Sequence, residues 1–515
     1  MKLKRGDCVK QGINPKAVYD FVKRCEAEDL GINTFMLIKD GVVVAEGYHS
    51  PYTNEGKHVM YSLSKSITAI ALGYAVDEGR VSLEDSVCKY FGEYDRRGRN
   101  EKITVRHLVT MTAGKMIGMA SDRKDRDWIK IFFDAPFFFK PGKHFLYTND
   151  NFYVLSAIIS KVYGQTLVDF LYPRLFEPLG IDKPDWEVDK FGYAAGGWGL
   201  YLSTEDLSKI MLCYSQYGKW EGKQVIPEEW VRESSAYQVP TNKKGQIDVT
   251  KGYGYGFWRL SRENSYRAYG LHGQMGYVFE DKNTVLAMTC GISKDMYMSD
   301  AINEMCKTLW DEPDKSYSGK LKELLSSLGD MDDLPKTIRN RKLELDYNQK
   351  ALMTRSSSFA SMLPATMSTV MHHNVGRIDR FILSLDSDNN YYMAWKEGDY
   401  VNKVKLGMEN RYEATPVNLA GIRMTAYTKA AWTQEKELTV LVRIGETCCV
   451  RRLVFDFTNK NHIIIKNDSY PDLPQLAAHY VNFSGIILPK SLERLLEKHI
   501  APAVLLLGEP DFKIK

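Results

Sequence analysis

The chain has 515 residues, which is too long for one ordinary hydrophobic core and predicts two to three domains. Its 44% hydrophobic and 26% charged residues are typical of a soluble globular protein. A net charge of +4, from 69 basic and 65 acidic residues, creates no strong field and argues against nucleic acid or an anionic membrane as a partner.

Eight cysteines are scattered along the chain without Cys-x-x-Cys spacing, and the one close pair, Cys448 and Cys449, is vicinal. This pattern indicates reduced thiols rather than a disulfide framework. The basic N-terminus is not followed by the apolar segment of a signal peptide, and no apolar run approaches the roughly 20 residues of a membrane span. We therefore expect a cytoplasmic protein with no membrane attachment.

The first elements along the chain are two helices with a hairpin between them. Residues 14–30 predict a helix, and two apolar, β-branched runs then flank Asp40-Gly41, a pair typical of a tight hairpin turn. The stretch 59–74 has apolar residues at helical spacing, which predicts a helix with one buried face that begins at Ser62.

Helical patterns dominate the middle of the chain, and strands return near residue 255. Helices are expected at 154–163, 204–214 and 298–309, and a second hairpin at 276–288. Strands that occur early and late, with helices between them, predict an α+β fold whose sheet is assembled from both ends.

The composition changes after residue 312. Residues 313–358 are charged and serine-rich and predict a linker with one helix at 321–328, which leaves 1–312 as the first domain. Residues 359–515 predict a small antiparallel C-terminal barrel or sandwich, with short strands separated by turns expected at 380–385, 389–395, 421–427, 438–444, 450–457 and 462–466.

Ser62 and Lys65 are the best candidates for nucleophilic chemistry. They lie one helical turn apart on the same face, at a helix start whose free N–H groups favour negative charge. A hydroxyl beside an amine suits a serine nucleophile and the group that activates it. The same Ser-x-x-Lys pattern recurs at Ser86 and Ser121, and Ser62 by itself could simply be a helix cap.

Other hydrolytic machinery is absent from the sequence. There is no Gly-x-Ser-x-Gly elbow, none of the ten histidines has an evident place in a catalytic triad, and no His-Glu-x-x-His occurs. The sequence therefore predicts no metal and no cofactor.

Further motifs carry a family resemblance, which covers about residues 14–310. Ser62-Leu63-Ser64-Lys65 heads a helix, Tyr147-Thr148-Asn149 precedes another, and His272-Gly273 comes just before a late hairpin. In this order they resemble the serine β-lactamase and penicillin-recognising hydrolases, particularly the class C-like esterases, amidases and D-amino-acid peptidases. The segments 103–114 and 195–200 fit that branch as well.

The resemblance implies a β-lactamase/transpeptidase-like antiparallel sheet flanked by helices and a set of site residues. Tyr147 would be the phenolic acid/base and Asn149 a substrate-orienting amide. His272, Gly273 and Gln274 would border the substrate, with Gln274 standing where the family usually has glycine. A backbone N–H near Gln274 or Met275 would complete the oxyanion hole with that of Ser62. The C-terminal domain resembles the lipocalin-like barrel that some members append, although a packing or oligomerisation module stays open.

We therefore predict a serine hydrolase that cleaves a small ester, amide or short peptide through a Ser62 acyl-enzyme, with Lys65 and Tyr147 in acid–base roles. One alternative is a β-lactamase or D-alanyl-D-alanine carboxypeptidase. Another is a non-catalytic binding or scaffold protein that keeps the fold. The oligomeric state is left open.

Overall fold

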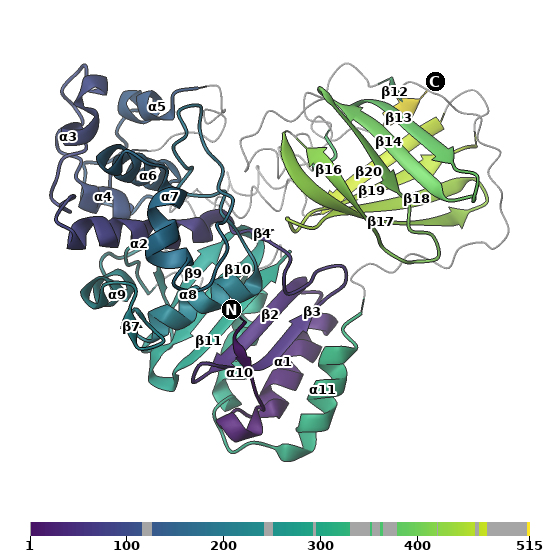
Figure 1. Ribbon diagram of the computed structural model, residues 1–515, viewed down its shortest axis with the longest axis horizontal. Helices are drawn as coiled ribbons and strands as arrows, with labels where there is room; N and C mark the ends of the chain where they lie inside the picture. The colour runs from purple at the N-terminus through teal and green to yellow at the C-terminus, as the bar shows by residue number, and fades with distance from the viewer. Residues whose placement is uncertain are drawn as a thin grey trace, which may run out of the picture. The chain divides into compact units, whose positions relative to one another are not determined.

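The computed structural model describes residues 2–115, 126–241, 251–291, 295–329, 351–352, 361–363, 378–419, 421–458, 463–470 and 512–514. These residues form two compact units (Figure 1). The first runs up to Gly329, and the second consists of the described residues from Ala351 on.

A mixed sheet with the strand order β1-β3-β2-β11-β10-β9-β8 forms the centre of the first unit. β1 runs parallel to β3, and the other neighbours in the sheet pair antiparallel. The strands are β1 (Lys4–Arg5), β2 (Ile32–Lys39), β3 (Val42–Tyr48), β8 (Trp258–Arg259), β9 (Ser265–Gly270), β10 (Gln274–Phe279) and β11 (Thr284–Cys290). Two short ribbons accompany it: β4 (His58–Val59) with β5 (Tyr201–Leu202), and β6 (Lys219–Trp220) with β7 (Lys223–Gln224).

The sheet is assembled from both ends of the unit, as predicted. β2 and β3 form the hairpin at Asp40-Gly41, whose φ angles of 50° and 78° are those of a tight two-residue turn. β11 pairs with β2, so that Met288 lies opposite Phe35. The late hairpin of β10 and β11 thereby becomes continuous with the early one.

Helices cover both faces of this sheet (Figure 1). Successive residues of a strand point to opposite faces. Phe35 of β2 meets Phe21 of α1 (Pro15–Ala27) edge to face at 6.4 Å, whereas Gly276 of β10 lies against the Met211 side chain of α8 (Thr204–Ser215) on the other face. α10 (Asp295–Thr308) and α11 (Ser318–Ser326) pack on α1, and α11 also contacts β3.

The remaining helices form a lobe beside the sheet, with α2 and α6 packed on each other. The helices of the first unit are α1 (Pro15–Ala27), α2 (Ser64–Asp77), α3 (Cys88–Phe91), α4 (Val105–Val109), α5 (Trp128–Asp134), α6 (Asp150–Tyr163), α7 (Leu167–Leu171), η5 (Tyr172–Phe176), α8 (Thr204–Ser215), α9 (Glu228–Ser235), α10 (Asp295–Thr308) and α11 (Ser318–Ser326). Within the described residues, no single helix is long and apolar enough to cross a membrane. The pair Asp150–Tyr163 and Leu167–Phe176, bent by 72°, passes such a test together.

Helix α2 differs from the prediction of one buried face, because every residue from Ser64 to Ala75 is buried. Its small hydroxyl side chains find partners in neighbouring loops: Ser66 donates to the Gly256 carbonyl at 2.6 Å and Thr68 to the Gly196 carbonyl at 2.8 Å. Buried polar groups need such partners, and with them α2 can run through the centre of the lobe.

Helix α11 falls inside the interval 313–358 that the sequence predicted as a linker. Leu321 is buried, and Leu328, just beyond the helix, lies against Gly47 of β3. The first unit therefore extends beyond residue 312, and residues 330–350 lie outside the described part of the chain.

The described residues of the second unit form β-strands and the turns between them, as predicted. Its large sheet has the order β12-β21-β20-β19-β18-β17-β16, and a smaller sheet has the order β13-β14-β15. β15 lies beside β16, and β12 beside β13, so the two sheets adjoin at both ends. The strands are β12 (Ala351–Leu352), β13 (Ile378–Leu385), β14 (Tyr391–Glu397), β15 (Tyr400–Lys405), β16 (Glu413–Leu419), β17 (Ile422–Gln434), β18 (Glu437–Ile444), β19 (Val450–Asp456), β20 (Ile463–Tyr470) and β21 (Phe512–Ile514).

Candidate active site

Ser62 lies in a single 3-10 turn, η2 (Tyr61–Leu63), immediately before α2. The chain enters this turn from β4, and the Met60 amide donates to the Leu200 carbonyl at 2.7 Å. Tyr61 has a φ of 45°, in the left-handed region that non-glycine residues rarely adopt. The sharp turn leaves Ser62 half-buried at the N-terminal end of α2, where the sequence predicted it.

Lys65 lies next to Ser62 and is completely buried. Its Nζ donates to Ser62 Oγ at 2.9 Å, to Asn149 Oδ1 at 2.7 Å and to the Gly197 carbonyl oxygen at 2.7 Å. The structure therefore joins three segments that are far apart in the sequence around one amine.

Burial lowers the pKa of Lys65 well below its ordinary value, and the negative charge of Asp150 raises it in part. Asn149 Oδ1 and the Gly197 carbonyl can only accept hydrogen bonds, so each takes an N–H from Lys65 in either protonation state. A neutral amine has two N–H groups for these acceptors, which leaves its lone pair for the Ser62 hydroxyl. This arrangement suits a base that removes the serine proton.

Tyr147 also lies beside Lys65. Lys65 Nζ lies 4.8 Å from the centroid of the Tyr147 ring, which is half-buried. The ring is held by other aromatic side chains: it lies 5.4 Å from Trp258 and 6.2 Å from Tyr253, with Phe145 at 6.3 Å. The structure thus brings Lys65 and Tyr147 together, and the aromatic cluster fixes the ring's position.

Asn149 precedes the first residue of α6, and its backbone is packed against the loop that follows Ala195. A Cβ on Gly197 would lie 2.7 Å from the Asn149 carbonyl oxygen, which excludes any larger residue there without movement. Sequence reasoning used the segment 195–200 only for the family resemblance and missed that the Gly197 carbonyl contacts Lys65. A backbone acceptor leaves no side-chain signature in the sequence.

His272 lies in the turn η7 (Leu271–Gly273) between β9 and β10. It is 2% exposed, and its φ of 60° places it in the left-handed region. Its ring meets that of Tyr61 edge to face, with centroids 5.8 Å apart. The structure therefore brings His272 against the residue that precedes the candidate nucleophile.

The neighbours of His272 also pack tightly around the turn of Ser62. A Cβ on Gly270, at the end of β9, would lie 2.2 Å from the Met60 carbonyl oxygen, a close approach that sequence reasoning missed. Gln274 is buried, and its side chain donates to the carbonyls of Leu271 and Cys290 and accepts from the Cys290 amide. These bonds fix its side chain between β10 and β11, which leaves its backbone as the part available for the predicted substrate role.

The competing Ser86 motif does not form an equivalent pair. Ser86 Oγ accepts from the Cys88 amide at 3.2 Å, whereas Lys89 Nζ bonds to the Asp85 carboxylate at 2.9 Å. Ser121, the third candidate, lies outside the described residues. Of the described motifs, the one at Ser62 is therefore the one with a direct serine–lysine bond.

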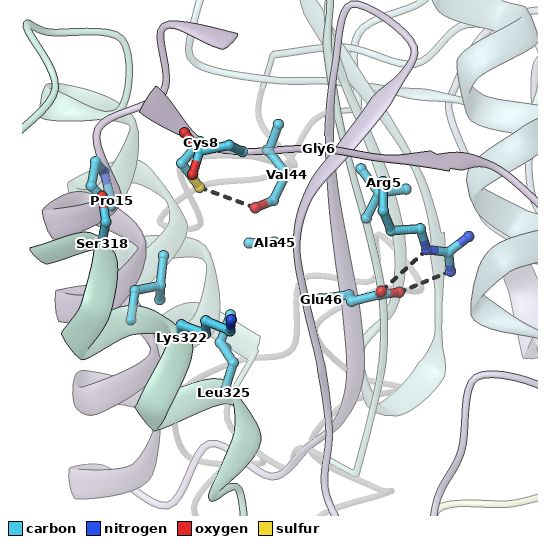
Figure 2. A pocket seen from close by; sticks show the side chains of 13 residues that line it. Arg5, Gly6, Cys8, Pro15, Val44, Ala45, Glu46, Ser318, Lys322 and Leu325 are labelled. Carbon is cyan, nitrogen blue, oxygen red and sulfur yellow. Dashed lines mark hydrogen bonds and ion pairs between the residues drawn. The ribbon is translucent and has the colours of Figure 1, made fainter. Parts of the chain in front are cut away.

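A cavity of about 370 Å³ lies elsewhere, between β3, α11 and the N-terminal residues (Figure 2). Arg5 forms an ion pair with Glu46 at one end, and Cys8 Sγ donates to the Val44 carbonyl at 3.0 Å. Burial raises the pKa of the Cys8 thiol to about 12, which leaves no thiolate for nucleophilic chemistry at neutral pH. Among the described residues, no three His, Cys, Asp or Glu side chains gather as metal ligands would.

A serine at a helix start bonded to a buried lysine, beside a largely antiparallel sheet flanked by helices, is the arrangement of a β-lactamase-like fold. The chain belongs to the Beta-lactamase family, whose sequence model matches residues 31–301. The matched interval begins before β2 and includes both Ser62 and His272.

Individual relatives share modest identity with this chain. Protein flp of Staphylococcus aureus (strain MW2) is 26% identical over 198 residues, which are 34% of this chain and 39% of flp, so the chain spans about two fifths of that relative's length. An uncharacterized protein of Alkalihalophilus pseudofirmus is 24% identical over 250 residues, covering 43% of this chain and 69% of its own. The crystal structure of a putative beta-lactamase from Bacteroides dorei superimposes with a TM-score of 0.51 at 16% identity, over 58% of this chain and 99% of that one, which shows a shared fold.

Proposed function

We propose that this protein cleaves a small ester or amide through an acyl-enzyme on Ser62. The observation that carries the proposal is the 2.9 Å hydrogen bond between Lys65 Nζ and Ser62 Oγ. It joins a hydroxyl at a helix start to an amine that burial biases toward its neutral, basic form. Tyr147 shares the acid–base work, and Asn149 orients the substrate.

In the acylation step the neutral Lys65 amine takes the Ser62 proton as Oγ attacks the substrate's carbonyl carbon. The carbonyl oxygen gains the negative charge, which backbone N–H groups of Ser62 and of β10 near Gln274 stabilise. The bond to the alcohol or amine then breaks, and the leaving group departs with a proton supplied through Lys65 and Tyr147. Water attacks the acyl-enzyme with the same groups in reversed roles, which releases the acid and restores Ser62.

The proposal assigns substrate contact to His272, Gly273 and Gln274. The turn that holds them is packed against Tyr61, next to the nucleophile. We expect a small-molecule ester, an amide or a short peptide as substrate in the cytoplasm, with no nucleic acid or membrane partner. A β-lactamase or carboxypeptidase reaction would use the same groups and differ in the substrate.

The test is intact-mass spectrometry after exposure to a fluorophosphonate and, separately, to a panel of β-lactams. We expect one fluorophosphonate adduct per chain that maps to the peptide containing Ser62. Ser62→Ala should abolish both the adduct and the hydrolysis of a short p-nitrophenyl ester, whereas the matched control Ser86→Ala should change neither.

Three other outcomes would contradict parts of the proposal. An adduct on Ser86 or Ser121 would move the nucleophile. With poor ester turnover, rapid hydrolysis of a β-lactam would favour the β-lactamase reaction, and a slowly released β-lactam adduct would favour the carboxypeptidase reaction. A folded protein that neither labels nor turns over any substrate would indicate a binding protein that keeps the fold.

A further inference from the structure

Two buried charged side chains lie inside the second unit, remote in the sequence from the catalytic motifs. Glu397 ends β14 and is 1% exposed; Arg451 lies near the start of β19 and is 3% exposed. Both occupy inward positions of their strands, because Trp395 and Leu453, two residues away, are buried as well. Charged groups are seldom buried this deeply without a specific partner.

Both side chains direct their polar atoms at one short segment, Ser361–Leu363. Arg451 Nη2 donates to the carbonyls of Ser361 at 2.8 Å and Leu363 at 3.1 Å, and its Nε donates to the Met362 carbonyl at 3.3 Å. The Glu397 carboxylate accepts from the Met362 amide at 3.1 Å and from the Ser361 hydroxyl. Five hydrogen bonds thus hold three consecutive residues.

Glu397 and Arg451 contact Ser361–Leu363 mainly through its main chain. Ser361–Leu363 belongs to none of the described strands, and the bonds from Glu397 and Arg451 to it are mostly bonds from side chains to main-chain groups. Met362 and Leu363 are 0% exposed, so their side chains fill apolar space in the unit. A few convergent polar groups set in an apolar surround are typical of a ligand site.

Supporting groups hold both charged side chains in place. Trp395 Nε1 donates to Glu397 Oε2 at 3.2 Å, and Arg451 Nη1 donates to Asn467 Oδ1 on β20. Desolvating two charges is costly, and well-packed apolar residues often give equal or greater stability than a buried pair. Stability alone therefore explains the pair poorly, whereas specific recognition of a peptide explains it directly.

We propose that the second unit carries a binding site for a short, bent peptide, a hydroxyl residue followed by two apolar residues, and that Ser361–Leu363 occupies it as a tethered ligand. Arg451 reads the three carbonyls, and Glu397 reads one amide together with the hydroxyl. A free peptide of the same pattern competes with the tethered segment for the same groups.

The test uses the full-length chain with Ser62→Ala, so that no probe is hydrolysed. The tethered segment is disabled by the triple substitution Ser361→Gly, Met362→Gly and Leu363→Gly. A fluorescein-labelled peptide with the sequence of residues 359–365, Phe-Ala-Ser-Met-Leu-Pro-Ala, is titrated while fluorescence anisotropy is measured. We expect saturable binding to the triple variant and at least about tenfold weaker binding to the chain with its own segment, because a tethered competitor acts at roughly millimolar effective concentration.

Two controls decide which groups bind. In the triple-variant background, Arg451→Gln should abolish binding, whereas Arg452→Gln, which changes the adjacent and half-exposed arginine, should leave it unchanged. A probe with alanine in place of its serine should bind about tenfold more weakly, since Glu397 then loses a donor.

A triple variant that keeps its β-sheet circular dichroism but shows no saturable binding overturns the proposal, as does binding that survives Arg451→Gln. If the triple variant does not fold, the titration is repeated with Met362→Gly alone, which removes one buried side chain. If that variant also fails to fold, Ser361–Leu363 is an ordinary structural part of the unit, and the proposal is overturned in the same way.

Discussion

Tyr61 and His272 meet edge to face across the site, with ring centroids 5.8 Å apart, and both have left-handed backbones with φ of 45° and 60°. Such conformations cost free energy in non-glycine residues and persist only where their surroundings enforce them. Here they hold the turn of Ser62 against the turn that leads into β10. The contact therefore sets the distance between Ser62, the proposed nucleophile, and the strand proposed to receive the oxyanion.

Replacing the His272 ring, which contacts Tyr61, should lower the activity more than the free energy of unfolding. We expect His272→Asn to reduce kcat/KM for a p-nitrophenyl ester by about 10- to 100-fold, because small misplacements of reacting groups have effects of this size. Asparagine tolerates the left-handed backbone, so the fold should be retained. The control is His144→Asn, which changes an exposed histidine and should leave the rate within about twofold of wild type. Equal losses in both variants would remove His272 from the site.

The pH dependence of activity should report Lys65. Burial lowers its pKa well below the ordinary value of 10.5, and the neutral amine is the proposed active form, so kcat/KM should rise with pH through that lowered pKa and then level off. Asp150 raises the pKa of Lys65, and Asp150→Asn should therefore move the rising limb to lower pH. A limb that stays in place or moves upward would show that another group controls it.

The same shift has a consequence for stability with a defined sign. Between the lowered pKa and 10.5, Lys65 is neutral when folded and protonated when unfolded, so the unfolded chain binds more protons. Its contribution to the free energy of unfolding therefore rises with pH across that window, and the cost of burying the charge is fully present below the lowered pKa. Urea titrations at several pH values should show this slope in wild type and lose it in Lys65→Met.

The sequence predicts a structural feature only where the residues that form it are close together along the chain. The hairpins at Asp40 and Asn283 were predictable because turn residues and flanking β-branched runs are neighbours in sequence. Ser62 and Lys65 were predictable because one helical turn fixes their contact. Asn149 came only from a family resemblance, because no local rule links it to a lysine far upstream.

Other features had no readable signal. Ser66 and Thr68 appear polar in the sequence, yet both are buried because carbonyls of distant loops accept from them, which is why α2 was predicted to have only one buried face. Strands β15 and β16 were missed because charged residues and Pro416 interrupt their apolar pattern. Contacts between the two strands hold them in place instead: the side chain of Asn402 in β15 donates to the Asn418 carbonyl of β16 at 2.9 Å.

Removing the hydroxyl of Tyr147 should test whether this residue is the second acid–base group. Tyr147→Phe should lower turnover by roughly 10²–10⁴-fold, the usual effect of a positioned acid or base, while the aromatic packing with Trp258 keeps the fold. Lys65→Ala should be equally damaging, and the double variant little worse than either single one, because we propose that the two residues act as a unit. Turnover of a short p-nitrophenyl ester, with circular dichroism as the folding control, measures this. Near wild-type rates for Tyr147→Phe would leave His272 as the next candidate base.

Limited proteolysis should separate the proposed domains. The charged, serine-rich interval 313–358 is proposed as the connection, and α11 is packed on α1 and β3 within it. The first cuts are therefore expected after Gly329 rather than at 313–326, and mass spectrometry of the fragments locates them. First cuts between residues 60 and 150, or resistance throughout 330–358, would contradict this boundary.

The glycine that brings its carbonyl to Lys65 offers the sharpest test of the site's geometry. A Cβ at residue 197 would lie 2.7 Å from the Asn149 carbonyl oxygen, so Gly197→Ala must push the loop and α6 apart. Two of the three acceptors of Lys65 Nζ, Asn149 Oδ1 and the Gly197 carbonyl, would then shift together. We expect a loss of about 1–3 kcal/mol in the free energy of unfolding and a fall in kcat of at least about tenfold.

The matched control is Gly319→Ala in α11, where nothing lies within 4 Å of the added methyl group. Alanine favours helix over glycine, so this variant should keep full activity and gain up to about 1 kcal/mol. Urea denaturation and ester turnover are measured on both variants. If Gly197→Ala lost stability but kept wild-type kcat, the three-acceptor arrangement around Lys65 would not be needed for turnover, and the lysine would act on Ser62 without it.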